Sequence, residues 1–237
     1  MTINTDRLKS ECAALGVEAD KIAFERFDIY ARLLIEWNER MNLTSITEPA
    51  AIVTRHFADS ASFFAAAVPP HGASLIDVGS GAGFPGMAIK ILRPDMDVTL
   101  LDATNKRITF LQAVSEQLGL KITALHSRAE DAAAKAAYRE CFDYATARAV
   151  AELRLLAEYC LGFVKCGGDF IAMKGQLSDD ELKSAHNAIN TMGGKISSKT
   201  VLTLADGSER QLLTVKKISH TPTKYPRCSA QISKKPL

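Results

Sequence analysis

The sequence lacks the features of exported, membrane-bound and disulfide-rich proteins. It contains no apolar run near the ~20 residues that a membrane-spanning helix needs, and residues 1–13 carry charges where a signal peptide has its apolar core. Its five cysteines are scattered, without a CxxC pair or a Cys/His cluster at metal-binding spacing. We therefore expect a cytoplasmic protein with reduced thiols, no membrane anchor and no metal.

The chain also lacks an overall excess of either charge, because its net charge is only +2. The basic residues are unevenly placed, however: residues 210–237 contain seven of them and no acidic residue. A basic end on a near-neutral chain fits a polyanionic partner, and it fits a solubilising tail equally well. With 47% hydrophobic residues, the 237-residue chain can form one sizeable core, or a core with a small lobe.

Residues 1–70 read as a helical extension. Asn4 or Thr5 can cap a short helix and Asp20 a second one, in which Phe27, Tyr30, Leu34, Trp37 and Met41 recur at steps of three or four. Thr47-Glu48-Pro49 predicts another helix start, and the helical pattern continues to Val68. Residues 69–72, Pro-Pro-His-Gly, break this pattern. We place the boundary here, with a second domain over residues 71–237.

From residue 74 onward short apolar runs alternate with helical ones. Such alternation predicts an α/β fold with parallel strands and right-handed crossovers. The expected strands are Ser74–Val78, Val98–Leu101, Ile122–Leu125, Tyr144–Thr146 and Asp169–Met173. Asp206-Gly207 between Lys195–Leu204 and Arg210–Ser219 indicates a hairpin. The prediction is a mostly parallel seven-stranded sheet that ends in an antiparallel C-terminal hairpin.

A glycine-rich loop, Asp77 to Gly86, joins the first expected strand to a helix that starts near Met87. Gly81 to Gly86 fits the G-x-G-x-x-G pattern of dinucleotide-binding proteins, but a lone match is weak evidence. Asp77 would repel a pyrophosphate and attract the ammonium of an amino-acid cofactor, and Pro85 removes one N–H donor. The loop, including Gly79, therefore favours S-adenosylmethionine over NAD.

Two further segments are candidates for the cofactor. Asp102, followed by Ala103 and Thr104, ends the second strand, where a carboxylate can accept hydrogen bonds from ribose hydroxyls or else cap the next helix. Ala129 and Glu130 follow the third strand, at the position of the adenine edge in such sheets; an ordinary helix start is the alternative. Phe84 either covers the cofactor or packs under the loop.

Motifs spread over nearly the whole chain resemble the RsmG family, also called glucose-inhibited division protein B. The residues that carry the resemblance are Trp37-Asn38, Met41–Thr44, Arg55–Ser60, Asp77–Gly86, Lys106-Arg107, Phe110-Leu111, Ala129-Glu130, Thr146–Ala151, Lys165, Gly167-Gly168, Met173–Gly175 and Tyr225–Arg227. One departure is visible: the family usually has a basic residue and a glycine after Pro-Arg, where this chain has Cys228-Ser229-Ala230.

The resemblance implies a bacterial methyltransferase that modifies N7 of a guanine in 16S rRNA. It implies a Rossmann-like class I S-adenosylmethionine-dependent fold, with the cofactor against Gly79, Phe84, Ala129, Glu130 and Arg148. The expected partner is 16S rRNA or the assembling 30S subunit, and the expected state is a monomer. Because N7 carries a lone pair and no proton, neither a general base nor a cysteine nucleophile is needed. Arg148 would orient the cofactor or the guanine.

N7 lies in the deep, narrow major groove of A-form RNA, so the target guanine must be in a loop, flipped out or presented on a particle. The candidate phosphate contacts are Arg55, Lys106, Arg107, Lys174 and Arg227, each of which could be an ordinary surface charge. His56 and Asp59 are expected to form a structural pair. Three other functions stay open: a methyltransferase of the same fold acting on a protein or small molecule, an NAD-dependent oxidoreductase, and a non-catalytic RNA-binding factor.

Overall fold

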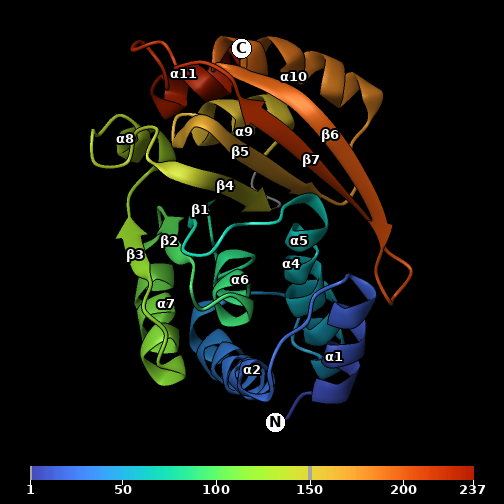
Figure 1. The fold of residues 1–237 in the computed structure, drawn as a ribbon. Helices are drawn as coiled ribbons and strands as arrows, with labels where there is room; N and C mark the ends of the chain where they lie inside the picture. Colours follow the sequence, from blue (N-terminus) through green and yellow to red (C-terminus); the bar gives the residue numbers. More distant parts are fainter. Residues whose placement is uncertain (1, 149–150) are drawn as a thin grey trace.

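A seven-stranded sheet runs through the middle of the molecule in the order β3-β2-β1-β4-β5-β7-β6 (Figure 1). The computed structural model describes residues 2–148 and 151–237. Strands β1 to β5 pair in parallel, whereas β7 is antiparallel to both β5 and β6. The strands are β1 (Ser74–Val78), β2 (Asp97–Asp102), β3 (Thr123–His126), β4 (Phe142–Arg148), β5 (Val164–Lys174), β6 (Gly194–Thr203) and β7 (Glu209–Lys217). The predicted parallel sheet with an antiparallel hairpin is confirmed.

One strand differs from its prediction in length. β5 begins at Val164 rather than at Asp169, and it passes through Gly167 and Gly168. Its pairing with β4 shifts register between Phe142 and Tyr144, and Gly167 has a φ of +87°. Because Lys165, Cys166 and Gly167 are all exposed, they form no apolar run, and the sequence pattern did not reveal this first part of the strand.

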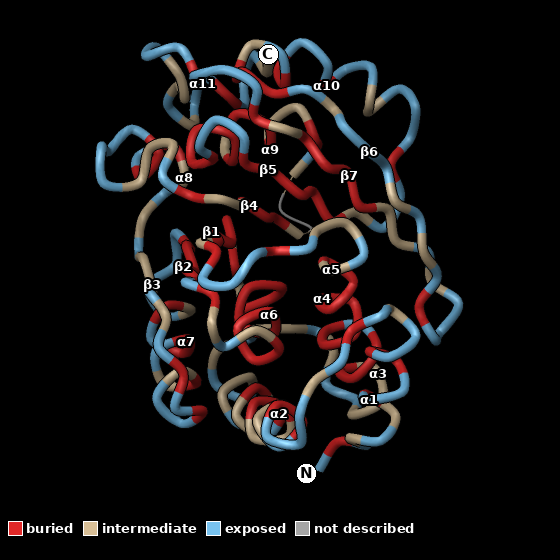
Figure 2. The backbone as a smooth tube through the Cα atoms, viewed as in Figure 1, coloured by how far each residue is buried: buried red, intermediate tan, exposed pale blue. Residues whose placement is uncertain are grey.

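Helices cover both faces of the sheet, and each face has its own apolar cluster (Figures 1 and 2). On one face lie α1 (Thr5–Ala14), α2 (Lys21–Met41), α6 (Gly86–Leu92) and α7 (Asn105–Leu118). On the other lie α8 (Ala129–Ala133), α9 (Leu153–Cys160), α10 (Asp179–Thr191) and, at the end of the chain, α11 (Ser229–Lys234). Right-handed crossovers place helices on both faces of a parallel sheet in this way.

The N-terminal extension starts as its sequence predicts. The Asn4 side chain accepts a hydrogen bond from the Arg7 amide, and the Asp20 side chain accepts one from the Ala23 amide. Phe27, Tyr30 and Leu34 on α2 are buried in the same cluster as α6 and α7. The extension is therefore packed directly onto the helices that flank the glycine loop.

The segment after Thr47 is not the continuous helix that its pattern predicts. It is divided into α3 (Pro49–Ile52), a π-helix η1 (Val53–Ala58), α4 (Asp59–Ala61) and α5 (Phe63–Ala66). A π-helical turn carries an extra residue, and such turns are frequent at functional sites. Apolar periodicity does not distinguish it from an α-helix, because both bury one face. Here the π-turn carries His56, and Asp59 follows directly after it.

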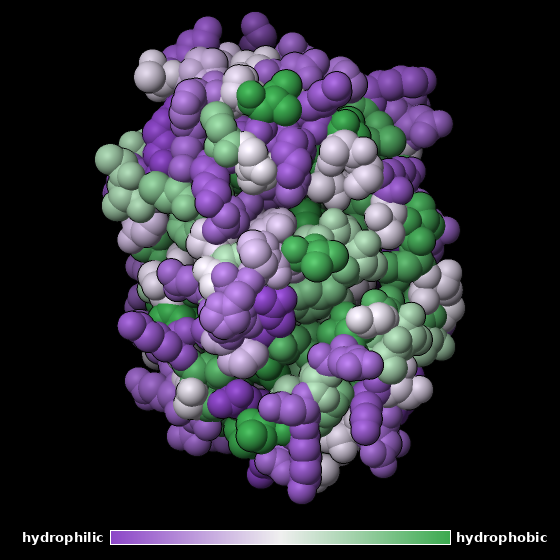
Figure 3. All heavy atoms as spheres, in the orientation of Figure 1, coloured by the Kyte–Doolittle hydropathy of each residue, from purple (hydrophilic) through white to green (hydrophobic). Residues whose placement is uncertain are grey.

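Hydrophilic side chains cover most of the face seen in Figure 3, and hydrophobic ones gather in a band across its middle. No helix among the described residues has the length and apolar character to cross a membrane. Within residues 2–148 and 151–237, histidine, cysteine and acidic side chains form no group that could hold a metal ion.

Candidate functional site

The glycine-rich loop leaves β1 and is hydrogen-bonded to the end of β2. Gly79 and Gly81 have φ values of +73° and +58°, which glycine adopts without the strain that a Cβ atom introduces. The Gly79 and Ser80 amides donate to the Leu101 carbonyl at 2.8 and 3.0 Å, respectively. These bonds hold the loop open at the carboxyl ends of the parallel strands, where ligands bind in this class of sheet.

Asp102 joins three neighbouring segments. Its carboxylate accepts hydrogen bonds from the Gly81 amide at 3.0 Å and from the Thr104 amide at 2.8 Å, and the Arg107 guanidinium lies at 3.3 Å. The side chain is almost fully buried. These three contacts use most of the roughly four acceptor positions of a carboxylate. Asp102 thus holds the loop in place. It does not cap α7, because its hydrogen bond goes to the amide of Thr104, the residue that precedes the helix, and not to an amide of α7.

Asp77 lies beneath the loop and is completely buried. One oxygen accepts a hydrogen bond from the Gly86 amide at 2.8 Å, and the other has no partner among the described residues. Burial raises the pKa of this carboxyl from 3.8 to about 7, a shift opposed by the Gly86 hydrogen bond and by the charge of Arg148. A cation beside the loop would favour the ionised form, as predicted for a cofactor that carries an ammonium group.

A cleft of about 350 Å³ opens beside the loop, at the ends of β1, β2 and β3. It brings together four of the predicted cofactor residues: Gly79, Ala103, Ala129 and Glu130. Asp77, Gly81, Asp102 and Thr104 are not among the lining residues; they form or support the loop behind it.

Sequence reasoning did not name the other eight lining residues as site residues. Among them are Leu155 and Tyr159 from α9, and Ser229 from the end of the chain. Leu155 and Tyr159 are four residues apart on one helix face, a spacing that also suits an ordinary core position. No pattern in the sequence singles out Ser229, because its place in the cleft depends on how the C-terminal segment folds back.

The Phe84 ring packs under the loop rather than over the cleft. It is only 5% exposed, and it stacks on His56 at 4.3 Å and on Tyr30 at 5.3 Å between ring centroids. The Arg148 guanidinium carbon lies 5.2 Å from the centre of the same ring. Of the two alternatives for this side chain, the structure supports packing under the loop, so any contact of Phe84 with a cofactor is left to its backbone.

Arg148, at the tip of β4, reaches toward the N-terminal extension. It donates to the Asp59 carboxylate at 2.9 Å and to the Arg55 carbonyl at 3.1 Å, and it lies 3.3 Å from His56 Nδ1. Asp59 also accepts from Arg210 of β7 at 2.8 Å. The pairing expected between His56 and Asp59 is replaced by contacts of both side chains with Arg148. Ala149 and Val150, which follow in the same motif, lie outside the described residues.

His56 is an acceptor in this network. Burial, and then the charge of Arg148, lower its pKa from 6.5 to about 3, so the ring is neutral at physiological pH. Because Nδ1 faces the Arg148 donor, the proton belongs on Nε2, which lies 3.0 Å from the Thr44 hydroxyl. A neutral ring held in this way orients the guanidinium without competing for the Asp59 charge.

Comparison with known proteins agrees with this geometry. Residues 23–213 match the GidB family, described as rRNA small subunit methyltransferase G. The chain is 46% identical over 235 residues to ribosomal RNA small subunit methyltransferase G of Clostridium perfringens, covering 98% of both chains. It is 44% identical over 227 residues to the protein of that name in Brevibacillus brevis, covering 95% of both.

The chain belongs to the GidB family. Solved structures add the fold. YcgJ of Bacillus subtilis superposes with a TM-score of 0.54 at 13% identity, over 69% of this chain and 100% of that one. A SAM-dependent methyltransferase of Aquifex aeolicus gives 0.51 at 15% identity, over 73% and 96%. With the strand order above, these likenesses confirm a Rossmann-like class I methyltransferase fold for this GidB family member.

The five predicted phosphate contacts of this GidB protein have different surroundings. Arg55 pairs with Asp206 at 2.8 Å and Arg107 lies 3.3 Å from Asp102, but their side chains stay 54% and 43% exposed; Lys106 is also exposed. In contrast, Lys174 pairs with Glu181 at 2.7 Å, and Arg227 pairs with the buried Glu158 at 2.7 Å. The charge of the last two is largely offset within the protein.

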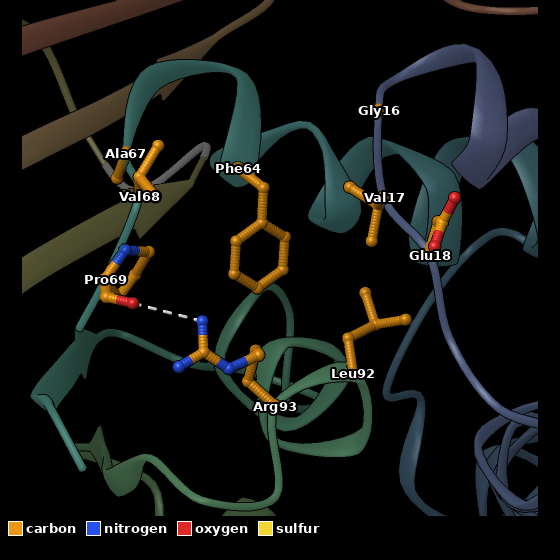
Figure 4. A pocket seen from close by; sticks show the side chains of 9 residues that line it. All are labelled: Gly16, Val17, Glu18, Phe64, Ala67, Val68, Pro69, Leu92 and Arg93. Carbon is orange, nitrogen blue, oxygen red and sulfur yellow. Dashed lines mark hydrogen bonds between the residues drawn. The ribbon is translucent and has the colours of Figure 1, made fainter. Parts of the chain in front are cut away.

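A second hollow, of about 210 Å³, contains none of the predicted site residues (Figure 4). Val17, Phe64 and Leu92 point into it, and Arg93 at its rim donates to the Pro69 carbonyl at 3.1 Å. It lies at the end of α6 remote from Gly86. Its lining mixes apolar side chains with Glu18 and Arg93, and Arg93 is already paired with Asp95 at 2.7 Å. The cleft at the loop, where the predicted residues meet, is therefore the candidate site.

Proposed function

We propose that this protein transfers the methyl group of S-adenosylmethionine to N7 of a guanine in 16S rRNA. The observation that carries the proposal is the cleft in which Gly79, Ala103, Ala129 and Glu130 meet at the carboxyl ends of the strands, in a member of the GidB family. The acceptor is 16S rRNA, free or in an assembling 30S subunit, so the protein would act in the cytoplasm, and we propose that it does so as a monomer.

The residues at the loop fit a cofactor with an amino-acid end and a nucleoside end. Bare backbone at Gly79 and Gly81 allows close approach, and Asp77 beneath the loop would carry a negative charge once a cation lies beside it. We assign Asp102, next to the lining residue Ala103, to accepting a hydrogen bond from a ribose hydroxyl, and Ala129 and Glu130 line the same cleft. When bound, the cofactor supplies an electrophilic methyl group.

The protein's own part in the reaction is alignment. Guanine N7 needs no deprotonation, so a rigid site that holds it in line with the methyl group can supply about 7–11 kcal/mol of the barrier reduction through proximity. Asp59 and His56 fix the Arg148 guanidinium at the tip of β4. We assign Arg148 to orienting the bound base or cofactor, without proton transfer.

Binding of RNA would begin with phosphate contacts. Arg55, Lys106 and Arg107 keep exposed guanidinium or ammonium groups, which suits them to this role. Lys174 and Arg227 would have to leave their partners, Glu181 and Glu158, to contact a phosphate fully. The first three are therefore the stronger candidates among the five.

The test is transfer of label from methyl-labelled S-adenosylmethionine into naked 16S rRNA, 30S particles, bulk protein and small metabolites, with mass spectrometry of the modified nucleotide. Label at guanine N7 in rRNA is the expected result. Label found only in protein or metabolites would overturn the RNA assignment. Calorimetric titration with S-adenosylhomocysteine and with NADH completes the test, because binding of NADH alone would reject the cofactor.

A matched pair of variants ties activity to the cleft. Gly79→Asn adds a side chain to a residue that lines the cleft, whereas Gly119→Asn adds one at the end of α7, where a Cβ would have no atom within 4 Å. Both glycines have positive φ, +73° and +61°, which asparagine tolerates better than most residues. We expect Gly79→Asn to abolish rRNA methylation and Gly119→Asn to retain it. Equal activity of the two variants would contradict catalysis in this cleft.

A further inference from the structure

The C-terminal segment is fastened to α9 by an ion pair. The Arg227 side chain donates to Glu158 through Nε at 2.9 Å and through Nη2 at 2.7 Å, and the Arg227 amide donates to the same carboxylate at 2.8 Å. Glu158 is only 1% exposed. A bidentate pair with a buried carboxylate is among the strongest hydrogen-bonded arrangements in proteins. The Arg227 guanidinium is thus held by a carboxylate of the protein interior.

Further contacts hold the same segment on both sides of Arg227. Arg139 donates to the carbonyls of Tyr225 at 2.8 Å and Thr221 at 2.7 Å. Arg227 Nη1 donates to the Lys235 carbonyl at 2.9 Å, and Ile232 on α11 is completely buried. The end of the chain is consequently a folded part of the domain, seen in Figure 1 as α11 lying against α9.

This attachment brings the segment to the cofactor cleft. Ser229, two residues after Arg227, lines the cleft together with Tyr159 and Leu155 of α9. Glu158 and Tyr159 are neighbours in the chain, so one helix turn both holds the C-terminal segment and forms the cleft wall. A displacement of Arg227 from Glu158 would therefore move Ser229 relative to Tyr159.

We propose that residues 225–234 form a wall of the S-adenosylmethionine cleft, with Ser229 in contact with the cofactor and Arg227 and Glu158 as its positioning pair. The inference rests on the proposed function. It assigns Arg227 to positioning the cleft wall in place of phosphate binding, because its charge is already offset by a buried carboxylate. It also gives a role to the segment in which this chain departs from its family pattern, Cys228-Ser229-Ala230.

Two matched substitutions on α11 test the wall directly. Ser229→Tyr fills part of the cleft, whereas Ser233→Tyr adds the same side chain at an exposed position one helical turn later. We expect Ser229→Tyr to raise the calorimetric Kd for S-adenosylhomocysteine by at least about tenfold, and Ser233→Tyr to leave it unchanged. Equal Kd values for Ser229→Tyr and wild type would overturn the inference while leaving the proposed function intact. If wild type itself binds no S-adenosylhomocysteine, both fall.

Arg227→Lys tests the positioning pair without removing the charge. Lysine cannot form the bidentate contact with Glu158, so the Kd for S-adenosylhomocysteine should rise while the salt dependence of rRNA binding stays as in wild type. A second variant, Arg227→Gln, removes the charge. If Arg227 contacted a phosphate, this variant would lower the log–log salt slope of rRNA binding by about 0.7–0.9 and leave the Kd for S-adenosylhomocysteine unaltered. That second pattern would refute the inference and restore Arg227 to the RNA-binding residues.

Discussion

Replacing Asp77 by asparagine should make the protein more stable at alkaline pH and weaken its cofactor binding. Asp77 is fully buried, and only one of its oxygens has a hydrogen-bond partner, the Gly86 amide at 2.8 Å. Burial raises the pKa of the Asp77 carboxyl to about 7 in the folded protein, against 3.8 for the free side chain. The folded protein therefore keeps this proton over a pH range in which the unfolded chain has lost it.

The direction in which stability changes with pH follows from this difference in pKa. Below about pH 4 both states are protonated, and stability is unaffected by this group. Between about pH 4 and 7 the unfolded state loses its proton first, so the free energy of unfolding falls as pH rises. At about 1.4 kcal/mol per pKa unit, the difference between 3.8 and about 7 sets an upper bound of about 4 kcal/mol. An asparagine amide without a partner takes back about 1–3 kcal/mol, leaving Asp77→Asn more stable than wild type by about 1–3 kcal/mol at pH 8.

Denaturant unfolding of wild type and Asp77→Asn from pH 4 to pH 8 measures this effect. The free-energy difference between the two proteins should favour the variant increasingly up to about pH 7 and then level off. Parallel pH profiles would refute the account of Asp77 as a buried group that titrates near neutrality. Calorimetry at pH 7 gives a second test. An ammonium group bound near Asp77 should make the Asp77 carboxyl of wild type release part of a proton on cofactor binding, whereas the variant should release none.

Three further outcomes follow from the site. Gly86→Ala should lower the free energy of unfolding by about 1–3 kcal/mol, because the added Cβ would lie 2.8 Å from the Asp77 side chain. Gly175→Ala is the control for the same denaturant unfolding: its Cβ would have no atom within 4 Å, so it should be neutral. Asp59→Asn should reduce the methylation rate about tenfold or more, because Arg148 loses its carboxylate; additive effects of Asp59→Asn and Arg148→Ala in a double-variant cycle would contradict that. Lys106→Ala should reduce the salt slope of rRNA binding by about 0.7–0.9 with an unchanged S-adenosylhomocysteine Kd.

Local backbone requirements explain why the sequence revealed the fold and the loop. A glycine adopts positive φ at little cost, so Gly79 and Gly81 mark the turn after β1 whatever the rest of the chain does. The helix caps at Asn4 and Asp20 and the Asp206-Gly207 turn are also decided by neighbours a few residues away. Alternating strands and helices then leave few possible sheet topologies.

Side-chain partners distant in the sequence were decided by packing alone. Arg148 meets Asp59, 89 residues earlier, only because η1 and α4 pack beside the tip of β4. The pairing of Arg227 with Glu158 spans 69 residues, and nothing in the local sequence around either residue indicates it. A charged residue reads the same in a sequence whether its partner is solvent, RNA or a buried carboxylate.

The sequence by itself determined most of the elements, their order and the backbone of the glycine-rich loop, because glycine, proline and apolar periodicity act on φ, ψ and burial locally. The tertiary structure decided which side of the loop Phe84 occupies, which carboxylate holds Arg148, and that Ser229 lines the cleft. Those features depend on contacts between segments tens of residues apart, whose geometry exists only once both apolar clusters have formed around the sheet.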